Sequence, residues 1–241
     1  MKYPLLNILL IDADPSLGKK LKELISMSGH RVKCCVDGIQ GFEAFCNGRF
    51  NFCVYDVVLP GIDGFMLTQR IRRRDPFIPI VIISKRCQKE EKQKCFNLGI
   101  DDYLVKPFDP DELIWRIQSI QRRMQLSTSL EEINPVFSFG CFSFDFSHQL
   151  LINDNKEQRL TRRECEVLRM LCSQKNKLVK RDEILMQLWG DVDYFHSRSL
   201  DVFISKLRRY LKDDPRLKIE NIPTVGYVLK DKSESTDASL E

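Results

Sequence analysis

The segment Phe52–Gly64 reads FCVYDVVLPGIDG, a short apolar run that ends in an aspartate and leads into a turn with proline and glycine. Similar apolar runs precede and follow it, and amphipathic helical stretches separate them. The five runs are Ile8–Ile11, Arg31–Val36, Phe52–Tyr55, Ile80–Ile83 and Tyr103–Val105. Strands that alternate with helices are typical of a parallel sheet covered by helices on both faces. We therefore predict a doubly wound α/β domain with a five-stranded parallel sheet.

The chain of 241 residues is 43% hydrophobic and 30% charged, with a formal net charge of +4. This length suffices for two domains, and no apolar run approaches the roughly 20 residues that span a bilayer. The start, Met1–Pro4, lacks the apolar core of a signal peptide. We expect a cytoplasmic protein without membrane contact. The nine cysteines include no C-x-x-C pair, so reduced thiols are expected, and a redox pair of Cys34 with Cys46 is the alternative.

The alternation of strands and helices ends near residue 123. Residues 124–135, MQLSTSLEEINP, are polar and end in an Asn-Pro breaker, as a linker would. From residue 136 onward the order changes to alternating aromatic residues, three helical stretches and a terminal hairpin near Ile219–Leu229. We predict an N-terminal domain over 1–123, a linker over 124–135 and a second domain over 136–230. Residues 231–241 are acidic, small and polar, and are expected to be disordered.

Polar side chains follow the strands at the edge where a parallel sheet places its ligands. They are Asp12 and Asp14 after the first run, Asp56 after the third, Ser84 after the fourth and Lys106 after the fifth. Carboxylates gathered at one edge repel one another unless a cation lies between them. A hard cation such as Mg²⁺ would hold them, with Asp56 as nucleophile toward a phosphoryl group whose oxygens Ser84 and Lys106 bind.

Five motifs, in order and correctly spaced, resemble the receiver domain of two-component response regulators, whose fold is flavodoxin-like. They are LLID at 9–12, YDVVLPGIDG at 55–64, Ser84, GIDDY at 99–103 and LVKPF at 104–108. The resemblance implies that Asp56 is the phosphoacceptor and that Ser84 and Lys106 support the phosphoryl group. It also implies that Tyr103 is an aromatic switch that turns inward on activation, with an ordinary half-buried strand tyrosine as the alternative.

Receivers usually carry two adjacent acids after the first strand, and this chain has Ala13 where the second acid stands. The resemblance implies a Mg²⁺ site made by Asp12, Asp56 and the backbone of Val58, with Asp14 as a further candidate ligand. Loss of one carboxylate weakens such a site. We therefore expect weak or slow phosphorylation, and a regulator that works without phosphorylation is the alternative. Asp12-Ala13-Asp14 also resembles the D-x-D motif of haloacid-dehalogenase phosphatases. We expect a regulator that is not an enzyme, and such a phosphatase is the alternative function.

The second domain contains three helical stretches. The first begins at Thr161–Glu164, a Thr-x-x-Glu capping box, and the second covers Arg181–Trp189. The third spans residues 197–211, and its apolar stripe consists of Leu200, Ile204, Leu207 and Leu211. The other side of this helix is basic and polar. Such a side fits the major groove of DNA, and a solvated helix surface is the alternative.

The segment RSLDVFISKLR at 198–208 resembles the recognition helix of the OmpR/PhoB winged-helix family, and its lead at 193–199 resembles the RprY type. The resemblance implies a transcription regulator with three partners: promoter DNA, a sensor histidine kinase and RNA polymerase. The residues that it places at the DNA are Arg198, Ser199, Val202, Phe203, Ser205, Lys206, Arg208 and Thr224. The wing at 222–227 lacks the arginine that members often insert into the minor groove. Phe203 stands where a polar residue is common, so contact with a thymine methyl and burial are both open.

The family resemblance also implies a homodimer through the last third of the receiver. Charge pairs across a two-fold axis would join Lys92 with Glu112, Asp102 with Arg116 and Asp101 with Arg123. Exposed pairs contribute little each, so these would set orientation more than affinity, and solvated helix charges are the alternative. The arginines at positions 70 and 72–74 are interpreted as a solvated helix end.

Overall fold

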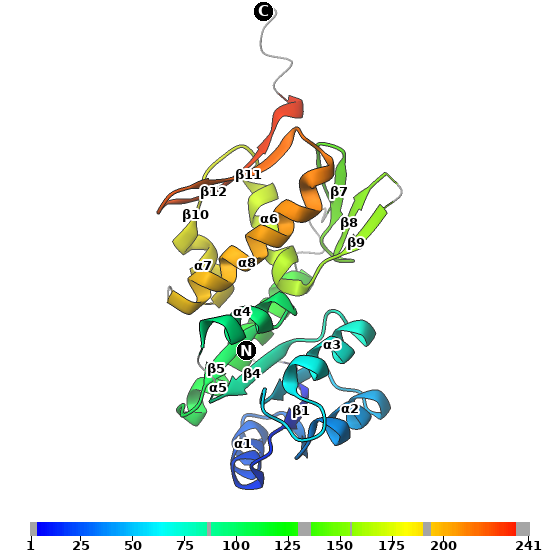
Figure 1. Cartoon of the computed structure of the whole chain (residues 1–241), viewed down its shortest axis with the longest axis vertical. Helices are drawn as coiled ribbons and strands as arrows, with labels where there is room; N and C mark the ends of the chain where they lie inside the picture. Colours follow the sequence, from blue (N-terminus) through cyan, green and yellow to red (C-terminus); the bar gives the residue numbers. More distant parts are fainter. Residues whose placement is uncertain (1–3, 86–87, 130–135, 155, 190–193, 235–241) are drawn as a thin grey trace, which may run out of the picture. The chain divides into compact units, whose positions relative to one another are not determined.

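The five apolar runs of the first half of the chain form one parallel sheet in the computed structural model (Figure 1). The structure describes residues 4–85, 88–129, 136–154, 156–189 and 194–234. They belong to two compact units, residues 1–125 and 126–241. Among the described residues, no helix combines the length and the apolar character that crossing a membrane requires.

In the first unit each strand is followed by a helix. The elements are β1 (Asn7–Ile11), α1 (Pro15–Met27), β2 (Arg31–Cys35), α2 (Gly38–Asn47), β3 (Phe52–Tyr55), α3 (Gly64–Arg74), β4 (Ile80–Ser84), α4 (Lys89–Asn97), β5 (Asp102–Val105) and α5 (Pro110–Ser129). The strands lie in the order β2-β1-β3-β4-β5 and pair in parallel throughout. Because the chain leaves β1 toward one side and returns to its other side with β3, the predicted doubly wound fold is confirmed.

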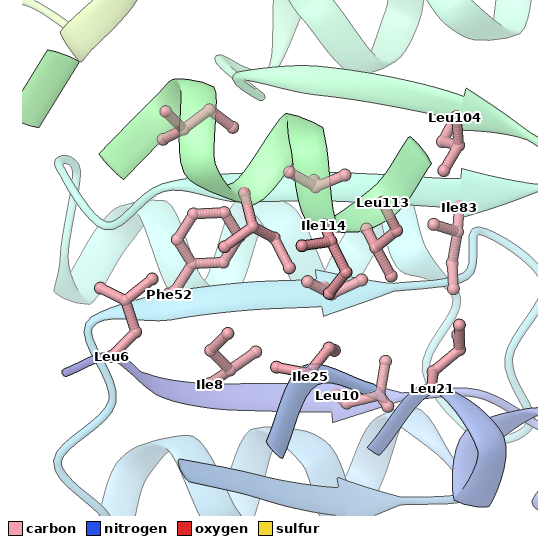
Figure 2. Close-up of a cluster of buried hydrophobic side chains, with 14 residues drawn as sticks. Leu6, Ile8, Leu10, Leu21, Ile25, Phe52, Ile83, Leu104, Leu113 and Ile114 are labelled. Carbon is pink, nitrogen blue, oxygen red and sulfur yellow. The ribbon is translucent and has the colours of Figure 1, made fainter. Parts of the chain in front are cut away.

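The core of the first unit contains one face of the sheet and helices α1 and α5 (Figure 2). Ile8 and Leu10 of β1 are fully buried there together with Leu21 and Ile25 of α1. Fully burying one such side chain stabilises the fold by about 1.5–3 kcal/mol. Met27, the last residue of α1, is by contrast 85% exposed. It lies two residues after Ile25, about 200° around the helix from the buried face.

The second unit contains two antiparallel sheets and three helices. Its elements are β6 (Val136–Phe139), β7 (Phe142–Asp145), β8 (Leu150–Asn153), β9 (Lys156–Arg159), α6 (Arg162–Ser173), β10 (Val179–Lys180), α7 (Arg181–Trp189), α8 (Tyr194–Tyr210), β11 (Leu217–Ile222) and β12 (Gly226–Asp231). Strands β6 to β9 form one sheet, and β12 lies between β10 and β11 in the other. The hairpin of β11 and β12 is the wing, so the predicted winged-helix α+β architecture is confirmed.

Ordered structure extends past two of the expected boundaries. Helix α5 continues to Ser129, so the first residues of the expected linker are helical, while residues 130–135 lie outside the described part. The expectation of a disordered tail from residue 231 is wrong for its first residues. Asp231 ends β12 and is 4% exposed, because its carboxylate accepts the backbone N–H groups of Gly140 and Ser233. Residues 235–241 lie outside the described part.

Candidate functional site

Three side chains from three strands meet at the carboxyl edge of the parallel sheet. Asp12 follows β1, Asp56 follows β3 and Lys106 follows β5. Lys106 Nζ lies 2.6 Å from Asp12 Oδ2 and 2.7 Å from Asp56 Oδ2. One ammonium therefore bridges both carboxylates at the strand ends.

The charges of this cluster are largely shielded from solvent. The side chains of Asp12, Lys106 and Asp56 are 2%, 9% and 11% exposed. Burial alone disfavours the ammonium, but hydrogen bonds to Asp12 and Asp56 outweigh it and raise the pKa of Lys106 above its usual value. Lys106 is therefore charged at neutral pH, and the three groups together carry one net negative charge.

Backbone groups orient the two carboxylates. The N–H of Asp14 donates to Asp12 Oδ1, and the N–H of Val58 donates to Asp56 Oδ1, each over 2.9 Å. The turn after Asp56 closes tightly at Gly64, where a Cβ atom would lie 2.6 Å from the carbonyl oxygen of Asp56. Glycine at this position thus permits the close approach of α3 that fixes the Asp56 loop.

Asp14 has a structural role that the sequence analysis did not predict. Its Oδ1 accepts the N–H groups of Ser16 over 2.9 Å and Leu17 over 3.2 Å, so this side chain is the N-cap of α1. Within the described ranges no group of three or more His, Cys, Asp or Glu side chains could hold a metal ion. Mg²⁺ nevertheless requires only one or two carboxylates when waters complete its shell. Asp12 and Asp56 therefore fit a weak Mg²⁺ site.

Ser84 and Tyr103 lie next to each other on β4 and β5. Ser84 is fully buried and Tyr103 is 8% exposed. Burial raises the pKa of the Tyr103 hydroxyl above its usual range, and its hydrogen bond with Ser84 opposes that effect. Lys92 of α4 lies with its Nζ 5.4 Å from the centre of the Tyr103 ring. Tyr103 thus points inward in this structure, and its movement on activation stays a prediction.

Residues of the predicted dimer contacts also interact within the chain. Arg116 lies 3.5 Å from Asp102 and 3.2 Å from Glu112. Asp101 is 2% exposed, and its Oδ2 accepts the N–H of Ile80 over 2.9 Å. The side chain of Arg123 lies outside the described part of the structure. Pairing between chains would have to compete with these contacts, and it stays a prediction.

The interpretation of the arginine run as a solvated helix end is wrong for Arg72. Its guanidinium donates to the carbonyl oxygens of Gly99 over 2.7 Å and Ile78 over 2.6 Å. It also lies 3.5 Å from Asp101. Arg72 thus ties α3 to the segments that precede β4 and β5. Its carbonyl partners were not foreseeable, because a backbone acceptor leaves no mark in a sequence.

All four residues of the predicted apolar stripe are buried. Leu200, Ile204 and Leu207 belong to α8, and Leu211 follows the end of the helix. Its exposed described side chains recur at helical spacing on one face, and they are Arg198, Ser205, Arg208 and Arg209. Thr224 at the tip of the wing is also exposed, with φ of +63°. The lead at 193–199 begins at Asp193, which lies outside the described residues.

Three of the predicted DNA contacts are buried. Phe203 is fully buried, and its ring stacks on Trp189 with the centroids 6.3 Å apart. Burial, rather than contact with a thymine methyl, is therefore the role of Phe203. Ser199 and Val202 are 2% and 6% exposed. Almost none of the surface of these three side chains is accessible to a ligand in this structure, and the predicted base contact by Ser199 and Val202 stays a prediction.

Lys206 is held by a carboxylate of α6. Its Nζ lies 2.7 Å from Glu164 Oε1, and the two side chains are 13% and 1% exposed. Glu164 Oε2 in turn accepts the N–H of Thr161, completing the predicted capping box. Lys206 therefore neutralises a buried charge, and its contact with DNA, which would have to compete with this ion pair, stays a prediction. A helical pattern could not reveal this pair, because its members are 42 residues apart.

Known protein families match both units. Residues 8–118 match the response regulator receiver domain, and residues 155–229 match the family described as transcriptional regulatory protein, C terminal. The transcriptional regulatory protein RprY of Bacteroides fragilis is 40% identical, covering 93% of this chain and 94% of its own length. The response regulator MprA of Mycobacterium ulcerans is 29% identical, covering 93% and 97%.

The folds of the two units are also found among solved structures. A cysteine-to-serine mutant of RitR superposes with a TM-score of 0.77 at 21% sequence identity, covering 94% of this chain and 99% of that one. At this sequence identity the similarity is evidence for a shared fold and for nothing about function. None of these findings supports a phosphatase.

Proposed function

The chain belongs to the response regulators that join a receiver domain to an OmpR/PhoB-type DNA-binding domain, and on that premise we propose that phosphorylation of Asp56 controls its binding to promoter DNA. We assign the receiver to residues 1–123, a linker to 124–135 and the DNA-binding domain to 136–230. The family is one of transcriptional regulators rather than catalysts. Promoter DNA and a sensor histidine kinase are its partners, and we place its action in the cytoplasm.

The observation that carries this proposal is the position of Asp56 beside Lys106 at the carboxyl edge of the sheet. A carboxylate oxygen of Asp56 would attack the phosphorus of a phosphodonor, and the bond to the donor's leaving group would break. Lys106 is charged and its Nζ lies 2.7 Å from Asp56 Oδ2, so its ammonium would bind the oxygens of a phosphoryl group on Asp56. Ser84, at the end of the neighbouring strand β4, would donate its hydroxyl to them.

Magnesium would be held by Asp12, Asp56 and the backbone of Val58. When bound, the ion would neutralise negative charge that develops on the phosphoryl oxygens. Ala13 provides no side-chain oxygen, and Asp14 is engaged as the cap of α1. We therefore infer that phosphorylation is slow at low millimolar Mg²⁺. A receiver that dimerises without phosphorylation is the second candidate, favoured by this missing carboxylate.

Contact with DNA would come from the exposed face of α8 and from the wing. Arg198, Ser205 and Arg208 are exposed and would reach base edges or phosphates in the major groove, and Thr224 lies at the tip of the wing. Arg208 would do so with its terminal nitrogens, because its Nε donates to the carbonyl oxygen of Ile219 over 2.9 Å. A dimer through α4, β5 and α5 would put two such helices on direct repeats. RNA polymerase is a further proposed partner of the DNA-bound dimer.

Phosphate incorporation from acetyl phosphate and Mg²⁺ tests this function in the full chain. We expect intact-mass analysis to show a phosphorylated form of the wild type, tighter DNA binding by that form, and neither effect in Asp56→Asn. Asp37→Asn is the matched control, because Asp37 caps α2 and hydrogen bonds to Gln40 instead of joining the cluster. Ala13→Asp should accelerate incorporation.

The outcomes separate the candidates. Incorporation that survives Asp56→Asn would place the phosphoacceptor elsewhere. If the wild type incorporates no phosphate, and acetyl phosphate changes neither its dimerisation nor its DNA binding, the protein is a phosphorylation-independent regulator. Saturating incorporation at low millimolar Mg²⁺, with no gain from Ala13→Asp, would refute the weak metal site.

A further inference from the structure

One arginine at the start of α7 contacts both DNA-facing parts of the second unit. Arg181 Nε donates to Ser197 Oγ over 2.8 Å, and its Nη2 donates to the carbonyl oxygen of Ser197 and, over 2.8 Å, to Asp201 Oδ1. Its Nη1 donates to the hydroxyl of Tyr227. Ser197 and Asp201 belong to the recognition helix α8, and Tyr227 belongs to the wing strand β12.

The same contacts form a closed network. The Tyr227 hydroxyl donates to Asp201 Oδ1 over 2.8 Å, the oxygen that also accepts from Arg181. Tyr227 is 2% exposed, so its ring and hydroxyl are fixed by packing. The backbone N–H of Arg181 donates to the carbonyl oxygen of Val225, at the tip of the wing, over 2.8 Å. Helix α8 and the wing are thus held by one side chain and its own backbone.

There is little room for the wing to shift in this arrangement. A Cβ atom at Gly226 would lie 2.1 Å from the carbonyl oxygen of Val179 and 3.0 Å from the backbone nitrogen of Arg181. The strand β12 therefore passes directly against the start of α7. The guanidinium has five N–H donors in a fixed fork, and these contacts engage all three of its nitrogens. Few donors of Arg181 remain for a phosphate or a base.

The network also reaches the exposed face of α8. Asp201 Oδ2 lies 3.8 Å from Nη1 of Arg198, which is 53% exposed. Arg198 is therefore oriented from the side by the carboxylate that Arg181 and Tyr227 hold. Resting on the proposed DNA-binding function, we propose that Arg181, Tyr227 and Asp201 are positioning residues that set the wing and Arg198 at a fixed spacing for simultaneous contact with one DNA duplex.

This role predicts a loss of discrimination without a loss of general affinity. Non-specific binding depends on the number of positive charges near the phosphates, whereas sequence-specific binding depends on where the contacting groups are held. Arg181→Lys and Tyr227→Phe keep the formal charge of the chain. Both should leave the affinity for arbitrary DNA unchanged and weaken binding to the preferred sequence.

The test uses the full chain and two duplexes of equal length. One is selected from a randomised pool by the wild type, and the other is its scrambled sequence. We expect Arg181→Lys and Tyr227→Phe to reduce the ratio of the two affinities roughly tenfold, the size of one lost base-pair contact. In hydroxyl-radical footprints, protection by the wing should weaken while protection by α8 remains.

Arg159→Lys and Tyr210→Phe are the matched controls, because Arg159 lies on the exposed strand β9 and Tyr210 ends α8 away from the network. Their discrimination should equal that of the wild type. Thermal unfolding of each variant identifies a folding defect, and if Arg181→Lys has one, Tyr227→Phe decides. The inference is overturned if Tyr227→Phe has the same ratio of the two affinities as the wild type, or if it loses affinity for both duplexes equally. Either result would leave the proposed function intact. Failure of the wild type to select any duplex would overturn the proposed function itself.

Discussion

Replacing Lys106 by methionine should destabilise the first unit by about 3–5 kcal/mol. That is the range for removing one partner from a buried ion pair, which leaves an uncompensated charge. The upper part of the range is expected, because the one ammonium serves two carboxylates, 2% and 11% exposed. Methionine keeps most of the volume of the lysine stem, so a cavity adds little to the loss.

Two further changes assign the loss to charge. Adding Asp12→Asn to Lys106→Met removes the more deeply buried of the two unpaired carboxylates, and it should recover most of the stability. Mg²⁺ should also stabilise Lys106→Met, by about 2.7 kcal/mol at a hundred times its dissociation constant. Sodium chloride at the same ionic strength should not, since a diffuse ion atmosphere does not replace a bound counter-ion.

Urea unfolding of the full chain, followed by pulsed hydrogen exchange, measures these effects in each unit separately. Peptides that cover β1 and β3 report the first unit, and peptides from α6 report the second unit as an internal reference. Lys85→Met is the matched control, because Lys85 is exposed at the same edge of the sheet, and it should change stability by less than about 0.5 kcal/mol. A loss below about 1 kcal/mol in Lys106→Met would refute the reasoning that the bridge neutralises buried charge.

Three further predictions concern the second unit. Phe203→Ala should destabilise it by about 3–5 kcal/mol in urea unfolding, because the ring is fully buried against Trp189; a loss within error would contradict its burial. Hydrogen bonds from Arg216 hold the pKa of Asp214 well below its usual range. This carboxylate therefore stabilises the fold in full above the unfolded-state pKa of about 3.9, and the stabilisation declines below that pH and is lost as the pH falls through the lower folded-state pKa. Asp214→Asn should lower the unfolding temperature at pH 6 more than at pH 3, and an equal effect at both would argue against the ion pair. Arg198→Ala should weaken specific DNA binding by about 1–3 kcal/mol in titrations at fixed salt without changing the unfolding temperature. Lys206→Met should instead lower the unfolding temperature, and the reverse pattern would identify Lys206 rather than Arg198 as the DNA contact.

The parallel sheet and the strand-end cluster were predictable, because both depend on patterns local in sequence. A short apolar run that ends in a carboxylate marks a buried strand and its carboxyl end together. Asp12, Asp56 and Lys106 therefore follow from the order of the strands, even though Lys106 is 94 residues from Asp12. That one ammonium bridges both carboxylates did not follow, because side-chain distances depend on the turns that carry them.

The DNA-facing surface was less predictable, because helical periodicity identifies a buried stripe but not the partners of the remaining side chains. Lys206 lies beside the stripe of α8, where a solvated or DNA-facing lysine is the ordinary expectation. Its actual partner, Glu164, belongs to another helix and is 1% exposed. Phe203 is similar, since only the position of Trp189 on α7 decides that its ring is covered. The side chains that meet around Arg181 likewise come from three different elements, α7, α8 and β12.

The Lys106 bridge limits how the receiver can hold a phosphoryl group. Two carboxylates share one ammonium, which leaves one net negative charge in a site that is mostly shielded from solvent. A phosphoryl group on Asp56 would replace one negative charge with nearly two, and Lys106 would then have to serve both Asp12 and the new oxygens. A divalent cation would neutralise the remainder, so Mg²⁺ should bind the phosphorylated chain more tightly than the resting one. It follows that Ala13 should slow the formation of the phosphorylated state more than it destabilises that state once formed.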